Sequence, residues 1–187
     1  YVFKPLDHGY KELTISPDSN GQYQMNPNAL HIWPREKFML IALPNMDASF
    51  TSTLFLPTKG PISFSTVNTD DEIVHLFNKY FPDAMPLISN LVSEYKNNTT
   101  GNLGSVYCDP WHFEDKAVIL GDAAHAVVPF FGQGMNASFQ DCSILNKLIE
   151  KYKSNWSLIF SEFSKLHVKN GHAIVDMALE NYVEMRG

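Results

Sequence analysis

The stretch from Ala117 to Asn136 reads AVILGDAAHAVVPFFGQGMN. Its apolar beginning predicts a buried strand over residues 116–120, which ends in Gly121-Asp122, and a glycine cluster follows at Gly132-Gln133-Gly134. A strand that delivers an acid at its carboxyl end, before a glycine loop that opens a helix, is typical of a site for a polar cofactor. We expect Asp122 to accept hydrogen bonds from sugar-like hydroxyls. We also expect the helix N-terminus to offer N–H groups to an electron-rich ring.

The composition is that of a globular protein. The chain has 187 residues, 44% hydrophobic and 18% charged, which is enough for about one ordinary domain. A net charge of -6 and the lack of a basic stripe argue against a nucleic-acid partner. Two cysteines, Cys108 and Cys142, make no disulfide framework and favour a reducing compartment.

Neither end of the sequence has the features of a natural terminus. The chain starts at Tyr1 without Met, shows no signal peptide, and stops at Gly187 while a helical pattern is still running. No apolar run has the length of a transmembrane helix. We therefore expect a part of a longer protein that is itself soluble.

The first part of the chain reads as β structure and the last part as helix. The pattern predicts extended segments over 22–33, interrupted at Asn26-Pro27-Asn28, and over 37–43, 49–56 and 62–67. Residues 37–43 are apolar on both faces, so we expect this strand to be covered on both sides and to form a hairpin with residues 49–56. Helices are predicted over 70–80, with Thr69 or Asp70 as the cap, and over 86–95. A short strand is expected at 105–108.

The strongest helix pattern lies at 135–152, where apolar residues form one stripe. A further helix is expected to begin after Asn155 and to be broken at Gly171, with a last helix beyond it. The change from strands to helices falls between residues 67 and 104. We expect a substrate-binding sheet region with helices over 1–100, the C-terminal part of a cofactor domain over 101–153, and closing helices over 154–187.

The segment Gly121-Asp122-Ala123-Ala124-His125 through Pro129, with Gly132–Asn136, resembles the second flavin-binding motif of the group A flavoprotein monooxygenases. These are FAD- and NAD(P)H-dependent aromatic hydroxylases of the p-hydroxybenzoate hydroxylase type. Residues 128–136, together with Asn181-Tyr182-Val183-Glu184-Met185-Arg186, look like the kynurenine-hydroxylating members, with the fungal type as the first choice. The resemblance covers essentially the whole chain. It implies an α/β (α+β) fold of the p-hydroxybenzoate-hydroxylase type, in which a substrate-binding sheet accompanies part of the FAD domain.

The resemblance also implies an activity. FAD, reduced by NADPH, would react with O2 to a C4a-hydroperoxide that hydroxylates L-kynurenine to 3-hydroxykynurenine. This reaction belongs to tryptophan degradation and de novo NAD biosynthesis. The implied partners are the small-molecule substrate and an N-terminal part of the same protein that carries GxGxxG. The implied location is the mitochondrial outer membrane facing the cytosol, reached through a C-terminal segment outside this chain.

The resemblance places two sets of residues around the site. The flavin-binding set is Asp122, Pro129, Gly132, Gln133, Gly134, Met135 and Asn136. The substrate-binding set is Leu30, Met39, Ile41, Leu43, Phe55, Pro129, Phe130, Phe131, Gln133, Asn181, Glu184 and Met185, with Asn181 as the best candidate to bind a polar substrate group. No residue is assigned as catalytic, no general base is evident, and no metal is expected.

The chain also departs from the family pattern. The GxGxxG motif, the second nucleotide motif containing Asp-Gly, and the Arg and Tyr pair that grips the substrate carboxylate are all absent from the sequence. The chain therefore holds half of a flavin site, and we expect no turnover from it alone.

Each assignment has a structural alternative. Asp122 could cap the turn that follows it, and the apolar set around Met39 could be ordinary core. The terminal helix carrying Asn181, Tyr182 and Glu184 could present a solvated face. His125 is expected to be structural. The rival functions are another group A flavin hydroxylase or epoxidase, and a non-catalytic FAD-fold interaction module.

Overall fold

The computed structural model describes all 187 residues and divides them into two compact units. The sheet unit contains residues 7–103 and 185–187, and the helical unit contains residues 1–6 and 104–184. The three-part division expected from the sequence remains a prediction.

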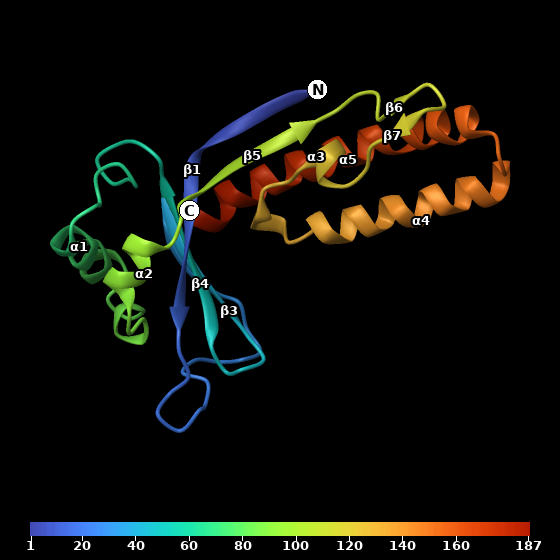
Figure 1. Cartoon of the computed structure of the whole chain (residues 1–187). Helices are drawn as coiled ribbons and strands as arrows, with labels where there is room; N and C mark the ends of the chain where they lie inside the picture. The colour runs from blue at the N-terminus through green and yellow to red at the C-terminus, as the bar shows by residue number, and fades with distance from the viewer. The chain divides into compact units, whose positions relative to one another are not determined.

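A five-stranded sheet runs in the order β2-β3-β4-β1-β5 (Figure 1). Its strands are β1 (Val2–Ile15), β2 (His31–Arg35), β3 (Phe38–Pro44), β4 (Phe50–Pro57) and β5 (Gly101–Tyr107). The predicted hairpin of β3 and β4 is confirmed, with Leu40 opposite Leu54. The 14-residue strand β1 is not marked out by the sequence pattern, yet it pairs with β4 from His8 to Ile15.

The two faces of β3 differ in how they are covered. Phe38, Leu40 and Ala42 belong to the core that the sheet forms with the helices of this unit. On the opposite face, Met39 is fully buried, Ile41 is half-buried and Leu43 is 48% exposed. The expectation of a strand covered on both faces therefore agrees with the burial of Met39 and is wrong at Leu43, near the end of the strand.

The helices of the sheet unit are α1 (Asp70–Tyr80), the 3-10 turn η1 (Met85–Leu87) and α2 (Leu91–Asn97). The predicted cap of α1 is confirmed: the Glu72 N–H donates to the Thr69 hydroxyl, and the Thr69 N–H donates to the Glu72 carboxylate. This reciprocal pair satisfies two backbone donors that the first turn leaves without partners. The single helix expected over 86–95 is instead two short elements.

Two predicted strands are wrong. Within 22–33, only residues 31–33 are extended in the sheet, and the segment before them is a series of turns. Residues 62–67 form bends and a turn, in which the Ser63 hydroxyl donates to the Gly60 carbonyl oxygen. Local side-chain bonds of this kind compete with strand pairing, which explains why the apolar alternation does not produce a strand.

The helical unit contains β6 (His112–Phe113), β7 (Ala117–Val118), α3 (Asp122–His125), η2 (Pro129–Phe131), α4 (Gly134–Tyr152) and α5 (Trp156–Arg186). Figure 1 shows α4 and α5 lying side by side. The strand expected over 116–120 is reduced to β7, which pairs with β6 in a two-stranded sheet. Val118, Ile119 and Leu120 are half-buried rather than buried, and they pack against the core of this unit.

Gly171 does not break the last helix, and α5 continues for 31 residues. The glycine instead permits a close approach: a Cβ at Gly171 would lie 2.6 Å from Cζ2 of Trp111. The buried indole therefore occupies the space that any side chain would need at this point of the helix.

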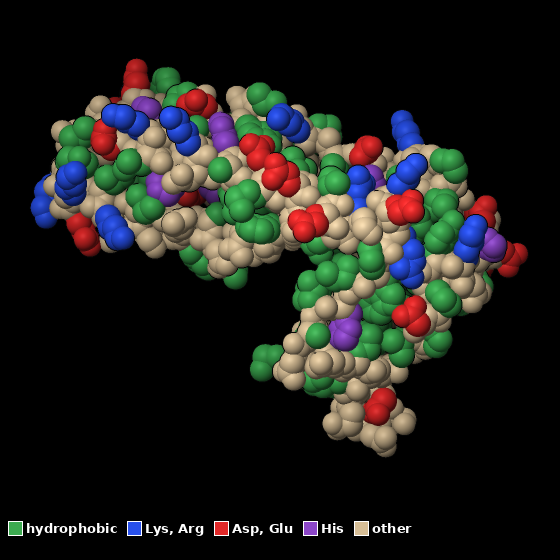
Figure 2. Space-filling view, turned by 180° about the vertical axis from the view of Figure 1, so that it is seen from behind, with side chains coloured by type: hydrophobic (Ala, Val, Ile, Leu, Met, Phe, Trp, Pro, Cys, Tyr) green, Lys and Arg blue, Asp and Glu red, His purple; other side chains and the backbone are tan.

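The predicted helix over 135–152 is confirmed, but its apolar stripe is buried only toward the end. Met135 is 70% exposed and Phe139 63% exposed, whereas Leu148 is buried. Cys142 on the same helix is exposed, and Cys108 is buried. On the face seen in Figure 2, acidic and basic side chains are interspersed. The structure contains no helix with both the length and the apolar character needed to cross a bilayer.

Candidate functional site

The turn after β7 presents Asp122. Gly121 has φ 60° and ψ -143°, a conformation that favours glycine, and it precedes the first residue of α3. A Cβ at Gly121 would also lie 3.0 Å from the Ser138 hydroxyl oxygen. Asp122 is exposed, so its carboxylate is available to a ligand.

The glycine loop leads into the N-terminus of α4. Gly132 is left-handed, with φ 63°, and Gln133 is the N-cap residue without a side-chain cap. The first helical hydrogen bond is donated by the Ala137 N–H to the Gln133 carbonyl oxygen. The N–H groups of Gly134, Met135 and Asn136 thus have no partner in the helix, and both Met135 and Asn136 are exposed. This end of α4 offers backbone donors and the positive end of a helix dipole.

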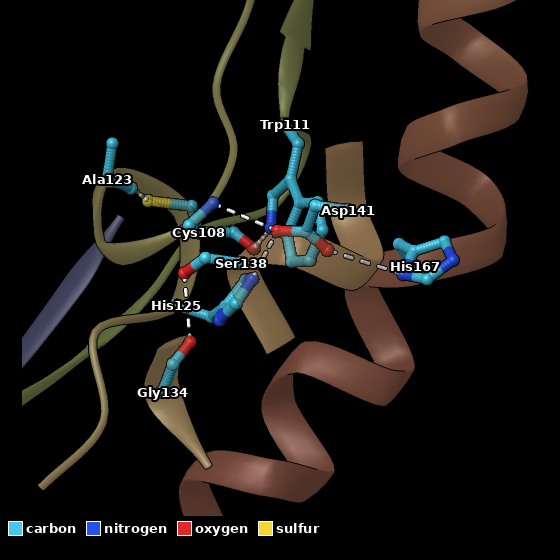
Figure 3. A network of polar contacts seen from close by, with 9 residues as sticks. Cys108, Trp111, Ala123, His125, Gly134, Ser138, Asp141 and His167 are labelled. Atoms are coloured by element: carbon cyan, nitrogen blue, oxygen red, sulfur yellow. Dashed lines mark hydrogen bonds and ion pairs between the residues drawn. The ribbon is translucent and has the colours of Figure 1, made fainter. Parts of the chain in front are cut away.

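A buried polar network lies beneath these two features (Figure 3). Asp141, from the second turn of α4, is 2% exposed. Its Oδ2 accepts from the Gly121 N–H at 2.9 Å and from His125 Nε2 at 2.7 Å, and its Oδ1 lies 3.6 Å from His167 Nδ1. Because an ionised carboxylate only accepts, His125 carries its hydrogen on Nε2. The expectation that His125 is structural agrees with its 2% exposure.

Trp111 packs against this network. Its ring centroid is 5.0 Å from that of His125, and its backbone N–H donates to the Ser164 hydroxyl at 2.9 Å. Its indole N–H donates to the Cys108 carbonyl oxygen at 2.9 Å. The ring of His167 also stacks on Phe163, with the centroids 5.5 Å apart. Aromatic rings thus pack against both histidines of the network.

Burial sets the protonation of His167. Desolvation lowers its pKa, the nearby Asp141 carboxylate raises it, and His125 lowers it further. Desolvation is the largest of these effects, so the pKa of His167 lies below its ordinary value and the imidazole is neutral at pH 7.

A groove of about 700 Å³ lies in the helical unit between α4 and α5. Gln133 and Asn136 line it, together with His125, Asp141 and His167. The side-chain amide of Asn136 donates to the Gln133 side-chain oxygen at 3.0 Å. Two predicted flavin residues therefore border the cavity that the buried network also lines.

The turn η2 separates its two aromatic residues. Phe130 is buried and stacks on Tyr182 of α5, with the ring centroids 3.9 Å apart, whereas Phe131 is 36% exposed. The Asn181 side-chain amide donates to the Phe130 carbonyl oxygen at 2.5 Å. Tyr182 is therefore not on a solvated face, and Asn181 has a partner within the protein.

The sheet unit carries the other predicted substrate residues. Met39 and Phe55 are opposite each other on β3 and β4, and both are buried. Ile41 and Leu43 follow on the same face, and Leu30, just before β2, is 46% exposed. The structure thus places an apolar row along one sheet face, on the side away from the core of α1 and α2.

All seven predicted flavin residues belong to the helical unit. The predicted substrate residues divide between the units. Pro129, Phe130, Phe131, Gln133, Asn181 and Glu184 lie in the helical unit, and Leu30, Met39, Ile41, Leu43, Phe55 and Met185 lie in the sheet unit. Their roles stay predictions.

Sequence reasoning missed Asp141. Its signal is present in the sequence, since no other Asp or Glu occurs between Asp122 and Glu150. A lone acid within a helix that follows a glycine loop is a candidate for a buried role, but only the fold shows that it faces Gly121.

Comparison with known proteins agrees with this geometry. A family model described as an FAD binding domain matches residues 78–158. The kynurenine 3-monooxygenase of Myxococcus xanthus is 50% identical over 181 residues, which are 97% of this chain and 39% of that protein. That of Sus scrofa is 47% identical over 188 residues, covering 100% of this chain and 39% of that protein.

The chain is thus similar over almost its whole length to proteins named kynurenine 3-monooxygenase, and part of it matches the FAD binding domain. It spans about 40% of the length of the curated relatives that it matches. Solved structures show the same fold at low identity. HpxO of Klebsiella pneumoniae, complexed with FAD and uric acid, has a TM-score of 0.74 at 14% identity, covering 100% of this chain and 47% of that chain. PqsL of P. aeruginosa, in complex with 2-aminobenzoylacetate, has a TM-score of 0.75 at 14% identity, covering 100% and 50%.

Proposed function

We propose that the full-length protein is an FAD- and NADPH-dependent monooxygenase that uses O2 to hydroxylate L-kynurenine to 3-hydroxykynurenine. One observation carries the proposal. The exposed Asp122 and the uncapped N-terminus of α4 lie in one unit of a chain whose relatives, at 43% to 50% identity, are named kynurenine 3-monooxygenase.

The turn at Asp122 and the N-terminus of α4, together called the flavin corner, fit FAD. Backbone donors without helical partners at Gly134, Met135 and Asn136 suit carbonyl acceptors of a flavin ring, and the Asp122 carboxylate suits hydroxyl donors. Gly132, Gln133 and Pro129 shape the loop between them. Bound FAD supplies hydride acceptance from the nicotinamide and activation of O2. In the proposed holoenzyme, the rest of the flavin site comes from an N-terminal part of the same protein that carries GxGxxG.

The chain's own residues have three tasks in this proposal. The dipole at the N-terminus of α4 would stabilise negative charge on a reduced flavin held there. In the helical unit, Phe130 and Phe131 would offer aromatic contacts to the substrate. In the sheet unit, the face at Met39, Ile41, Leu43 and Phe55, with Leu30, would offer apolar contacts. Apolar contacts of this kind exclude water and limit side reactions of the activated oxygen. Asn181 and Glu184 of the helical unit, and Met185 of the sheet unit, would contact the substrate, and the Asn181 amide also donates to the Phe130 carbonyl oxygen.

The activity is tested on the purified full-length protein. We expect bound FAD, NADPH oxidation that L-kynurenine stimulates, and 3-hydroxykynurenine as a product in mass spectrometry. Bound flavin without stimulation by L-kynurenine would favour another flavin hydroxylase or epoxidase. A protein that binds no flavin would favour the non-catalytic interaction module.

Asp122→Ala tests the flavin corner. Loss of a charged acceptor for ligand hydroxyls is expected to weaken FAD binding about 10- to 100-fold, measured by fluorescence titration of the apoprotein. Asp115→Asn, an exposed acid before β7, serves as the control and should bind FAD like the wild type. Unchanged FAD affinity in Asp122→Ala contradicts the assignment.

The proposed location is the mitochondrial outer membrane facing the cytosol, reached through a C-terminal segment outside this chain. The support is the family resemblance, which includes a mammalian relative. Fractionation of cells that express the full-length protein tests it, and recovery in the soluble fraction contradicts it.

A further inference from the structure

We infer that Asp141 is a positioning residue for the flavin corner: its buried carboxylate holds the Gly121 N–H and so fixes the turn that presents Asp122. The inference rests on the proposed flavin site. It concerns a residue that neither the sequence pattern nor the flavin assignment includes.

The first support is the contact itself. Asp141 Oδ2 accepts from the Gly121 N–H at 2.9 Å, one residue before Asp122. Gly121 has a positive φ, and its own carbonyl oxygen accepts from the N–H groups of Ala124 and His125, both at 2.9 Å. The backbone of this turn is thus fixed on both sides, and the carboxylate is the partner that fixes its N–H.

The second support is burial. A carboxylate that is 2% exposed costs free energy unless donors surround it. Here the donors are the Gly121 N–H and His125 Nε2, with His167 Nδ1 at 3.6 Å from the other oxygen. One side chain therefore connects the Asp122 turn, helix α4 and helix α5 (Figure 3).

The third support is the position of Asp141 on α4. It lies seven residues, or about two turns, after Gly134, so it shares a helix face with the first residue of α4. The Ser138 hydroxyl, between them, donates to the Gly134 carbonyl oxygen at 2.9 Å. Both halves of the flavin corner, the acidic turn and the helix N-terminus, are thereby held to the same stretch of helix.

A catalytic Asp–His pair does not explain the network. His125 and Asp141 are each 2% exposed, and His125 Nδ1 is buried without a hydrogen-bond partner. No serine, threonine or cysteine contacts that nitrogen as a nucleophile would. No group of side chains in the structure has the composition of a metal site.

The test measures FAD affinity in the full-length apoprotein for Asp141→Ala, Asp122→Ala and the double variant. We expect Asp141→Ala to raise the Kd for FAD about 10- to 100-fold, because a buried donor loses its acceptor. If Asp141 acts through the Asp122 turn, the effects of the two substitutions should not add. The Kd of the double variant should then lie within about threefold of the higher of the two single-variant Kd values. The inference is overturned if the increases in Kd of the two single variants multiply in the double variant, or if Asp141→Ala binds FAD with wild-type affinity.

The controls separate positioning from general stability. Glu150→Gln, which removes an exposed acid from the same helix, should leave the Kd unchanged. A lower melting temperature of Asp141→Ala with an unchanged Kd also overturns the inference. If Asp141→Ala does not fold, Asp141→Asn replaces it. The amide keeps an acceptor but loses the charge, so we expect a Kd raised about fivefold. Combined with Asp122→Ala, this substitution should again add little to the loss of affinity.

The two proposals fail in different ways. Wild-type FAD affinity in Asp122→Ala contradicts the flavin role of Asp122 and removes the basis of the inference with it. A weakened Asp122→Ala beside an unaffected Asp141→Ala leaves the flavin role intact and overturns only the positioning role.

Discussion

His167 shows that a neighbouring carboxylate does not by itself raise the pKa of a histidine. It lies 3.6 Å from Asp141, yet burial among Phe163 and Trp111 outweighs that attraction and lowers its pKa. The charge state of such a residue depends on desolvation first and on its partner second.

This lowered pKa makes stability depend on pH. The unfolded chain binds a proton at His167 near the ordinary pKa of about 6.5, whereas the folded chain binds it only at lower pH. Unfolding therefore takes up a proton in this window, and the free energy of unfolding falls as the pH drops below about 6.5. We expect the melting temperature of the protein to fall less between pH 7.5 and about 5.5 in His167→Gln than in the wild type.

His75→Gln is the matched control, because His75 is exposed in α1. It should melt with the pH dependence of the wild type. Equal pH dependence in His167→Gln and the wild type would contradict the role given to His167.

Single residues of the site could be predicted only where local chemistry decides their conformation. Gly121-Asp122 and Gly132 are readable because a turn after a strand and a left-handed loop residue have sequence signatures. The separation of Phe130 from Phe131 is not readable in detail, because the choice of the buried ring depends on Tyr182, about 50 residues later. The partner of Asp141 is hidden for the same reason.

At the scale of elements, helix α5 is set by packing rather than by propensity. A glycine in a helix interior costs about 1 kcal/mol relative to alanine, so the sequence favours a break at Gly171. The structure continues the helix there, and the missing side chain leaves the space that Trp111 occupies. The capping box of α1, by contrast, is complete within four residues and is fully predictable.

Gly171→Ala therefore has the opposite sign from the usual substitution in a helix. The added Cβ would lie 2.6 Å from Trp111 Cζ2 and 3.2 Å from His125 Cδ2, so the indole or the helix must move. We expect a loss of about 1–3 kcal/mol in the free energy of unfolding, measured by denaturant titration. Lys169→Ala, at an exposed position of the same helix, should change it by less than about 0.5 kcal/mol. A gain in stability for Gly171→Ala would contradict the close packing.

The strands illustrate the limits of pattern reading. Alternation located β3 and β4, whose register buries Leu40 and Leu54 in one core. The same pattern at 62–67 forms no strand, because Ser63 and Thr66 hydrogen-bond within their own turn. Strand pairing depends on a distant partner, so the sequence of one segment cannot decide it.

At the scale of the whole molecule, each of the two units has a core of its own. The core of the sheet unit draws on residues between Leu13 and Tyr95, and that of the helical unit on residues between Cys108 and Val168. The two cores have no residue in common. We therefore expect a substitution in one core to change the local stability of its own unit and not that of the other unit.

Leu40→Ala tests this separation. Leu40 is fully buried, so the truncation should destabilise the sheet unit by about 2–5 kcal/mol. Hydrogen exchange followed by mass spectrometry should then show faster exchange in β3, β4 and α1, with α4 and α5 unchanged. Leu166→Ala, at a residue 51% exposed in α5, is the control and should alter neither unit. Equal acceleration in both units would contradict separate cores.

The exposed thiol of Cys142 stands next to Asp141 on α4, while the other thiol of this chain is buried. Within this chain, a maleimide dye or nitroxide spin label would therefore attach at a single accessible position without any engineered cysteine. Such a label, on the exposed side of α4, would report on movements of the helix segment from which Asp141 contacts the Asp122 turn.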